Sequence, residues 1–307
     1  MGDIRIRGAS AAEVLAIAEP LLPHTIQVVA DLRGSGPARR VRIHLAARGD
    51  EPLGAVVFGE RCRGRWYASP VLIEPDAAAP LARFIDRSVA WEIGGPSGHV
   101  DPLVPHLTRT VRRRAIHEAF HCAEIPPVAF PVDPRCRLAT TDDLEALVDL
   151  YADYELGRFP TRPRLRQFLE RQLHSRPVTV AEVDGELGAA TLCLYRTPGY
   201  DMWADLTVRP DCRRQGLATA VGFAGITVST EAGQRVCAVI AGSNPMTVEQ
   251  ATSAADGWRT DADRWTQQPL QSPRRFPGHR RLRRAAERLE GRLQKRTPLL
   301  PHVSESG

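Results

Sequence analysis

The sequence is almost without lysine, has no paired-cysteine motif and contains no long apolar run. Lysine occurs once, at Lys295, so arginine supplies nearly all of the 41 basic residues, which indicates GC-rich coding and not a function. No stretch approaches the roughly 18 uninterrupted apolar residues of a transmembrane helix. The charged residues Asp3, Arg5 and Arg7 stand where a signal peptide needs its apolar region. We therefore expect a cytoplasmic protein with no membrane partner.

The cysteines are scattered over the chain, and no two of them form a CxxC pair. In a long chain without a secretion signal, this arrangement predicts buried reduced thiols and neither a disulfide framework nor a zinc site. The six positions are 62, 122, 136, 193, 212 and 237.

A chain of 307 residues exceeds the usual size of a single core, so two domains are expected. The proline-rich stretch 126–134 cannot be helical, because each proline lacks an N–H donor and restricts the residue before it. It predicts an extended linker. The expected domains are residues 1–125 and 135–270, followed by an arginine-rich tail at 271–307.

The second half alternates strand and helix patterns in the order β-α-α-β-β-β-α-β-α-β. Asp184-Gly185 between two apolar runs predicts a type I′ hairpin, and Gly233 ends a helix as its C-cap. A final strand is expected after Gly257-Trp258. The other expected elements are a strand at 136–140, helices from Leu144 and over 162–174, strands at 178–183, 187–195 and 202–208, a helix from Ala218, a strand at 236–240 and a helix at 247–256.

The first half repeats this rhythm more weakly. The pattern predicts a helix after Ser10, strands at 41–47, 53–59 and 66–73, a helix at 79–88, a strand at 89–93 and a helix at 100–107. An internal duplication with a period of about 130 residues follows from this outline. The expected fold class is α/β, with mixed sheets in two tandem domains.

The segment most suited to ligand binding lies between the strand that ends at Val208 and the helix that begins near Leu217. The first N–H groups of a helix have no internal partner and carry the positive end of its dipole, so a diphosphate fits there. Gly216 lets the backbone approach a ligand closely. The loop reads Arg213-Arg214-Gln215-Gly216-Leu217-Ala218-Thr219, and its arginines add positive charge. The alternative is a solvated basic turn before an ordinary amphipathic helix.

A strand, then Val-x-Pro, then [Arg/Gln]-x-x-Gly-x-[Gly/Ala] opening a long helix resembles the cofactor motif of the GNAT superfamily of acyltransferases. The start at Arg137–Thr140 and the pair Gly257-Trp258 also resemble that family, and the likeness covers about 135 residues. The layout is similar to that of actinobacterial acyltransferases with a degenerate N-terminal copy.

The resemblance implies that acetyl-CoA or another acyl-CoA binds with its diphosphate on the amides of Arg214 to Thr219. It implies that the thioester carbonyl faces a backbone amide between Leu206 and Val208. An amine, on a small molecule or a protein, attacks directly, and no metal takes part.

Three positions depart from the family pattern. Ser253 stands where the family often has a tyrosine that protonates the leaving thiolate. Asn244 lies two residues from the place of a frequent pantetheine-binding asparagine. Ala204 replaces a common glutamate, which leaves Asp205 as the nearest candidate for the general base and Asp201 as the second. A salt bridge or a surface position is the alternative for either aspartate.

His117-Glu118-Ala119-Phe120-His121 matches the HExxH zinc pattern, which requires a helix. On a strand, the two histidines would be roughly 13 Å apart, too far to share one metal. The stretch can be read as a helix extending from Val111 or equally as a strand leading into the linker, where the duplicated layout places the last strand of the domain. We expect no metal site.

Ten basic and two acidic residues lie between Pro273 and Arg296, so the tail is strongly basic while the rest of the chain is slightly acidic. A solvated helix or a disordered tail is favoured over a nucleic-acid partner, because no aromatic residue is interleaved with the arginines of residues 280–293 for base stacking. The first half has Glu74 and Asp76 where a diphosphate would lie, so it should not bind CoA but help to wall the acceptor pocket.

Two other functions remain open at this point. One is a non-catalytic CoA-binding or scaffold protein, and the other is an aminoacyl-tRNA-dependent transferase of the tandem-GNAT type. The sequence specifies neither the acceptor, nor the acyl chain length, nor the oligomeric state.

Overall fold

The computed structural model describes residues 3–62, 64–109, 115–122, 132–155, 161–241 and 258–271. Residues 1–271 form one compact unit. Among the described residues, no helix is long and apolar enough to cross a membrane.

The N-terminal half contains β1 (Ile4–Gly8), α1 (Ala11–Ala18), α2 (Ile26–Leu32), β2 (Val41–Arg48), β3 (Glu51–Cys62), β4 (Arg65–Leu72), α3 (Ala78–Asp86), β5 (Ala90–Pro96), α4 (Ser97–Val100) and β6 (Ala115–Cys122). The C-terminal half contains β7 (Cys136–Leu138), α5 (Leu144–Glu155), α6 (Arg162–Ser175), β8 (Val178–Val183), β9 (Glu186–Thr197), β10 (Tyr200–Val208), α7 (Leu217–Glu231), β11 (Arg235–Ala241) and β12 (Trp258–Pro269). From the first strand to β5 and to β11, the two halves repeat one order of helices and strands, so the predicted tandem α/β architecture is confirmed. The helix predicted at 247–256 lies outside the described residues.

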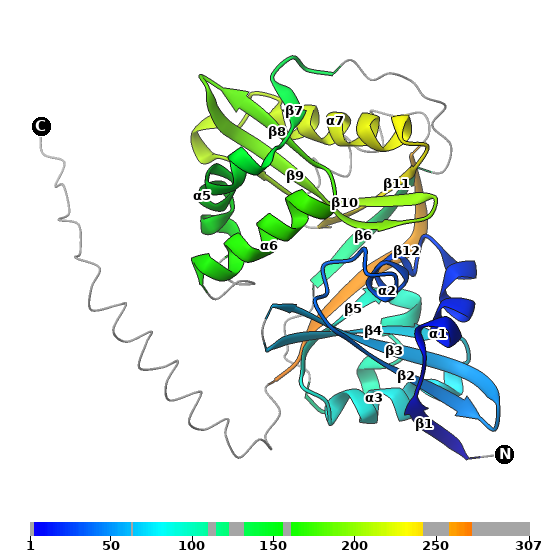
Figure 1. Cartoon of the computed structure of the whole chain (residues 1–307). Coiled ribbons are helices and arrows are strands. Elements are labelled where there is room, and N and C mark those ends of the chain that lie inside the picture. Colours follow the sequence, from blue (N-terminus) through cyan, green and yellow to red (C-terminus); the bar gives the residue numbers. More distant parts are fainter. Residues whose placement is uncertain are drawn as a thin grey trace, which may run out of the picture. The chain divides into compact units, whose positions relative to one another are not determined.

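The strands form one mixed sheet in the order β1-β2-β3-β4-β5-β12-β6-β11-β10-β9-β8-β7 (Figure 1). The halves exchange their last strands. β12 pairs with β5 of the N-terminal half, whereas β6 pairs with β11 of the C-terminal half. β6 and β12 also pair with each other, antiparallel, so a continuous ladder crosses from one half to the other. Backbone hydrogen bonding therefore fixes the two halves together.

Helices cover both faces of the C-terminal part of the sheet, because successive side chains of β8 and β9 point to opposite faces. Val178, Val180 and Leu192 pack with α5 and α6. Ala181 and Ala189 pack on the other face against Leu217 and Val221 of α7. This alternation places the start of α7 on the face opposite to α5 and α6.

The predicted hairpin and helix end are confirmed. Asp184 and Gly185 have φ angles of 53° and 80°, the positive values that a type I′ turn requires, and they join β8 to β9. Gly233 follows α7 with a φ of 70°.

Two elements, β1 and α2, are not among those that the sequence predicts. α2 shows no amphipathic pattern because both halves bury it. Its Ile26 and Ala30 belong to the core of the C-terminal half, while Val28 and Val29 belong to a core of the N-terminal half. One prediction was wrong in detail: the helix expected at 100–107 is a short α4 and a separate turn at Val104–His106, because Pro102 and Pro105 interrupt it.

Candidate functional site

The central strands of the C-terminal half diverge. β10 and β11 run parallel and pair from Tyr200 with Arg235 to Trp203 with Ala238. Beyond Trp203 and Ala238 the two strands no longer pair with each other, although β10 continues to Val208 and β11 to Ala241. Leu206 lies on this unpaired stretch and is 39% exposed, unusual for an apolar side chain in the middle of a sheet. The divergence therefore leaves the backbone of β10 near Leu206, and the Leu206 side chain itself, within reach of a ligand.

α7 begins beside this divergence, at the predicted loop. Gly216 is its N-cap, with a φ of 78°, a left-handed conformation that favours glycine. No side chain caps α7, and Ala220 is the first residue whose amide bonds back to the Gly216 carbonyl. A Cβ on Gly216 would meet nothing within 4 Å. The amides of the first turn thus face an unobstructed surface.

The charge around this helix start is positive. Arg213, Arg214, Gln215 and Gly216 are exposed, as are Ala218 and Thr219, whereas Leu217 is buried as the anchor of the helix. The first turn of α7 contains no acidic residue. The structure therefore brings the predicted cofactor residues of the loop together at one helix N-terminus, the arrangement that suits a diphosphate.

A β-bulge shapes β10 at the candidate general base. The register between β9 and β10 shifts between Ala204 and Thr207, and Asp205 has a φ of 54°. Two side chains hold the bulge: the Tyr151 hydroxyl donates to the Asp205 carbonyl at 2.6 Å, and the Thr191 hydroxyl donates to the Ala204 carbonyl at 3.2 Å. Asp205 is half-buried. The sequence predicts Tyr151 only as part of the helix that begins at Leu144.

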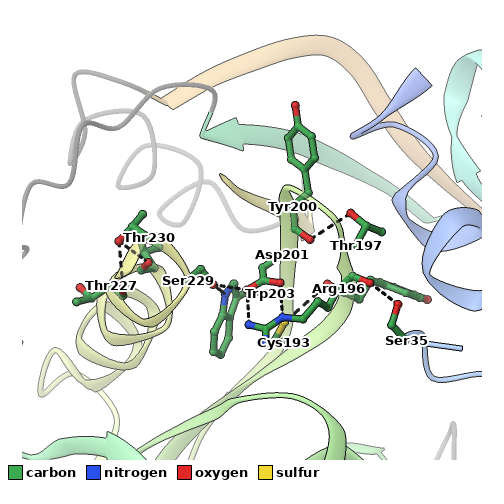
Figure 2. Close-up of polar contacts among 12 residues, drawn as sticks. Ser35, Cys193, Arg196, Thr197, Tyr200, Asp201, Trp203, Thr227, Ser229 and Thr230 are labelled. Atoms are coloured by element: carbon green, nitrogen blue, oxygen red, sulfur yellow. Dashed lines mark hydrogen bonds and ion pairs between the residues drawn. The ribbon is translucent and has the colours of Figure 1, made fainter. Parts of the chain in front are cut away.

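Asp201, the second candidate for the base, is fully buried at the closed end of the divergence (Figure 2). Arg196 donates two hydrogen bonds of 2.7 Å to its carboxylate. Ser229 of α7 donates to the same carboxylate at 2.8 Å, and Trp203 donates to Ser229 at 2.8 Å. Asp201 therefore has no access to a substrate, because its carboxylate is fully buried and bonded to side chains of the same half.

This network also fixes α7 on the sheet. A Cβ on Gly225 would lie 3.0 Å from the Trp203 ring, so only glycine lets the helix approach so closely. Gly225 and Ser229 hold the later turns of α7 against the closed end of the divergence. Because a helix is stiff, this contact also sets the position of its first turn.

The N-terminal half has a corresponding divergence with a different environment. β4 and β5 pair from Trp66 to Ala68 and then separate. The Leu72 amide, near the end of β4, donates to Nδ1 of His99 in α4 at 3.2 Å. Asp76, after β4, forms an ion pair of 2.8 Å with Arg48. The His99 side chain thus takes up the backbone donor at the end of β4, and the acidic Asp76 lies close to that end.

Two of the described cysteine thiols are held in the protonated form. Four of the described cysteines form no disulfide, and all of them except Cys136 are buried: Cys136, Cys193, Cys212 and Cys237. Burial, together with the charge of Asp201, raises the pKa of Cys193 and of Cys237, so both remain protonated near neutral pH.

Two predicted site residues, Asn244 and Ser253, lie outside the described residues. The HExxH segment is strand β6, so its histidines are not arranged as they are on the helix of a zinc site. Within the described ranges, no group of three metal-ligating side chains occurs.

Comparison with known proteins gives matches only at the level of structure. No family model matches the sequence, and no curated protein sequence matches it significantly. Solved structures do match over most of the chain.

A Drosophila protein is 15% identical with a TM-score of 0.62, and the match covers 88% of this chain and 99% of that one. A GCN5-related N-acetyltransferase from Sphaerobacter thermophilus is 17% identical with a TM-score of 0.58, covering 86% of this chain and 94% of the other. A tandem GNAT protein from the clavulanic acid biosynthesis pathway is 14% identical with a TM-score of 0.56, covering 87% and 98%. At these identities the likeness establishes the fold, which is that of the GNAT superfamily in tandem.

Proposed function

We propose that the C-terminal half of this tandem GNAT fold is an acyl-CoA-dependent N-acyltransferase, which moves an acetyl or other acyl group to an amine by direct attack. The observation that carries the proposal is the uncapped start of α7 at left-handed Gly216, beside the divergence of β10 and β11. In this proposal, residues 135–270 are the transferase domain, 1–125 a degenerate copy and 126–134 the linker.

The residues present fit an acyl-CoA. The amides of Leu217, Ala218 and Thr219 would hold its diphosphate, and exposed Arg213 and Arg214 add charge-assisted donors. Exposed Leu206 offers apolar surface beside the divergence for the pantetheine arm. When bound, acyl-CoA supplies a thioester, a carbonyl activated toward an amine.

The residues of β10 would carry the chemistry. Asp205 accepts the proton that the amine gives up, and a backbone amide between Leu206 and Val208 polarises the carbonyl under attack. Tyr151 and Thr191 hold the bulge of β10 in place. The Asp205 carboxylate and the backbone amide are therefore preorganised for the reaction. Whether Ser253 helps the thiolate to leave, and whether Asn244 contacts the pantetheine, remain predictions of the sequence.

The replacement Gly216→Glu tests the cofactor site, because it puts a carboxylate where the diphosphate would lie. Acetyl-CoA should raise the melting temperature of the wild-type protein and leave that of the variant unchanged. Gly222→Glu controls for the added charge, because it lies further along α7 and a Cβ there also meets nothing within 4 Å. Gly216→Asn controls for the backbone, because asparagine tolerates the φ of 78° better than other residues and adds no charge. Both controls should keep most of the shift. An equal shift in Gly216→Glu and the wild type would refute the site.

A non-catalytic CoA-binding role is the second candidate, and Ala204 is the observation that favours it, since many family members carry a glutamate there. Tight binding of acetyl-CoA without turnover of any amine would decide for this role.

A further inference from the structure

A cluster of charged and aromatic side chains lies where the two halves meet. It joins Arg61 at the end of β3, Tyr67 of β4 and Asp31 of α2 to Tyr195 of β9 and to Arg176, which follows α6. All except Arg61 are buried, with at most 8% of their surface exposed. Both halves contribute, so the cluster exists only in the assembled chain.

Most polar groups of the cluster are satisfied. The Tyr67 hydroxyl donates to the Asp31 carboxylate at 2.5 Å. Arg176 donates to the Ser35 carbonyl at 2.7 Å and makes two bonds, of 3.0 and 2.7 Å, to the Gln172 side chain. The Tyr67 ring lies where a Cβ on Gly59 would be only 2.3 Å away, so glycine makes room for it.

Arg61 is the exception. Its guanidinium lies over the Tyr67 ring, 5.1 Å from the centroid, and donates one hydrogen bond, of 3.2 Å, to the Tyr195 hydroxyl. Its Nε is buried and has no hydrogen-bond partner. None of the ion pairs among the described residues includes Arg61. The residue is partly exposed, and its guanidinium has more N–H donors than its one hydrogen bond to Tyr195 uses.

No carboxylate of the described residues forms an ion pair with Arg61, although the charges of Glu92 and Asp205 at longer range stabilise its guanidinium. The planar fork of arginine matches a carboxylate, which it binds through two parallel hydrogen bonds. The chemistry of Arg61 therefore points to a carboxylate supplied by a ligand.

Arg61 contacts the face of the C-terminal sheet that lies opposite to α7. Its partner Tyr195 pairs with Met202 of β10 and packs in the same core as Tyr151, on the face opposite to α7. Burial acts to lower the pKa of Arg61, but nearby groups, Glu92 and Asp205 among them, outweigh it and raise that pKa. The charge of Asp205 thus reaches Arg61 from the bulge.

We propose that Arg61 binds a carboxylate of the acceptor, and that the acceptor is an amine that also carries a carboxylate, as an amino acid does. This inference rests on the proposed function. The ammonium group would face Asp205, which takes its proton, and the carboxylate would face Arg61. The amine nitrogen then forms a bond to the thioester carbon and the carbon–sulfur bond breaks. CoA leaves as the thiolate and takes up, directly or through water, the second proton that the nitrogen releases when the amide forms. The carboxylate is unchanged.

The test uses pairs of amines that differ only in the carboxylate: L-amino acids and their carboxamides. Initial rates are measured with acetyl-CoA for the full-length protein, Arg61→Met and Arg61→Lys. We expect the wild type to favour acids over carboxamides at least tenfold in kcat/KM. Arg61→Met should lose at least tenfold with acids and little with carboxamides, and Arg61→Lys should be intermediate because it keeps the charge but not the fork.

The matched control is Arg42→Met. Arg42 also lies over an aromatic ring of the N-terminal half, 4.8 Å from the centroid of Trp66, but it is exposed and belongs to β2. It should keep the wild-type preference. A wild type that acetylates carboxamides or protein amines as well as acids, or an Arg61→Met variant that keeps the preference for acids, would overturn the proposal.

Melting temperatures of the same panel in the presence of CoA give a second readout that needs no turnover. Acids should stabilise the wild type and not Arg61→Met. Stabilisation by acids without turnover would support the carboxylate site while refuting the transferase. Turnover with no stabilisation by any acid would support the transferase and overturn the role of Arg61.

Discussion

The two halves of the chain contain the same divergence between parallel strands and use it differently. In the N-terminal half, the Leu72 amide at the end of β4 is bonded to His99, and Asp76 lies nearby. In the C-terminal half, β10 carries an exposed leucine at 39% and leads to a helix that starts at Gly216 without a side-chain cap. A duplicated fold can thus keep its framework in both copies while only one keeps features of a ligand site.

The contrast extends to buried aspartates. Asp201 of the C-terminal half is paired with Arg196 and ties α7 to β10. Asp31 of the N-terminal half is bonded to neutral Tyr67 instead. The first carboxylate therefore has an arginine in direct contact, whereas the second has no ion-pair partner among the described residues. Each difference between the halves can be tested by substitution.

The largest effect is expected from Asp201→Ala. This change leaves Arg196, Ser229 and Trp203 without the carboxylate that joins them, and breaking one side of a buried pair costs about 3 kcal/mol or more. Urea unfolding should show that loss. The control is Asp76→Ala in the N-terminal half, whose ion pair is exposed and should contribute less than about 1 kcal/mol. Equal losses would show that the closed end of the C-terminal divergence is not specially braced.

The second effect is a pH dependence centred on Asp31. Burial raises the pKa of this carboxyl to about 6, against an ordinary value of about 3.9. The folded protein therefore holds the proton more tightly than the unfolded chain does. This contribution to stability is complete below pH 4 and is lost as the pH rises through about 6, and it amounts to roughly 3 kcal/mol. Asp31→Asn should remove this fall in unfolding free energy between pH 4 and 7. An unchanged fall would assign it to other groups.

The third effect concerns catalysis and applies only to the C-terminal half. Asp205→Asn should lower kcat by about tenfold or more and remove the acidic limb of the pH–rate profile, because the amine loses its proton acceptor. Acetyl-CoA affinity should change little. The corresponding control is Glu74→Gln, at the end of the N-terminal divergence, which should leave the profile as it is. An Asp205→Asn enzyme with an unaltered profile would leave positioning and the backbone amide as the sources of catalysis.

The smallest effect is expected from His99→Ala. It removes the acceptor of the Leu72 amide, a loss of about 1 kcal/mol in the free energy of unfolding. Even so, the N-terminal half should not gain a CoA site, since the segment after β4 has no glycine corresponding to Gly216. A second acetyl-CoA site in this variant would show that His99 alone had blocked it.

Local patterns predicted much of the fold. Asp184-Gly185 predicted the hairpin of β8 and β9, and the spacing of apolar residues predicted α5 and α6. Both predictions succeeded because turn chemistry and helical periodicity are local properties. The helix start at Gly216 could be predicted for the same reason. α2 could not, because burial against both halves removes its polar face.

Long-range contacts were beyond such patterns. The exchange of β6 and β12 depends on pairing between segments more than 130 residues apart along the chain. Asp201 looked like a possible base because its partner Ser229 is distant in sequence. No local pattern distinguishes Arg61 from the other arginines, because its contact with Tyr195 joins residues of the two different halves.

Isothermal titration of the full-length protein with acetyl-CoA tests the central claim most directly, namely that only the C-terminal half holds an acyl-CoA site. One site per chain is expected in the wild type, none in Gly216→Glu and one in Gly222→Glu. Two equivalent sites in the wild type, or one remaining site in Gly216→Glu, would contradict the account.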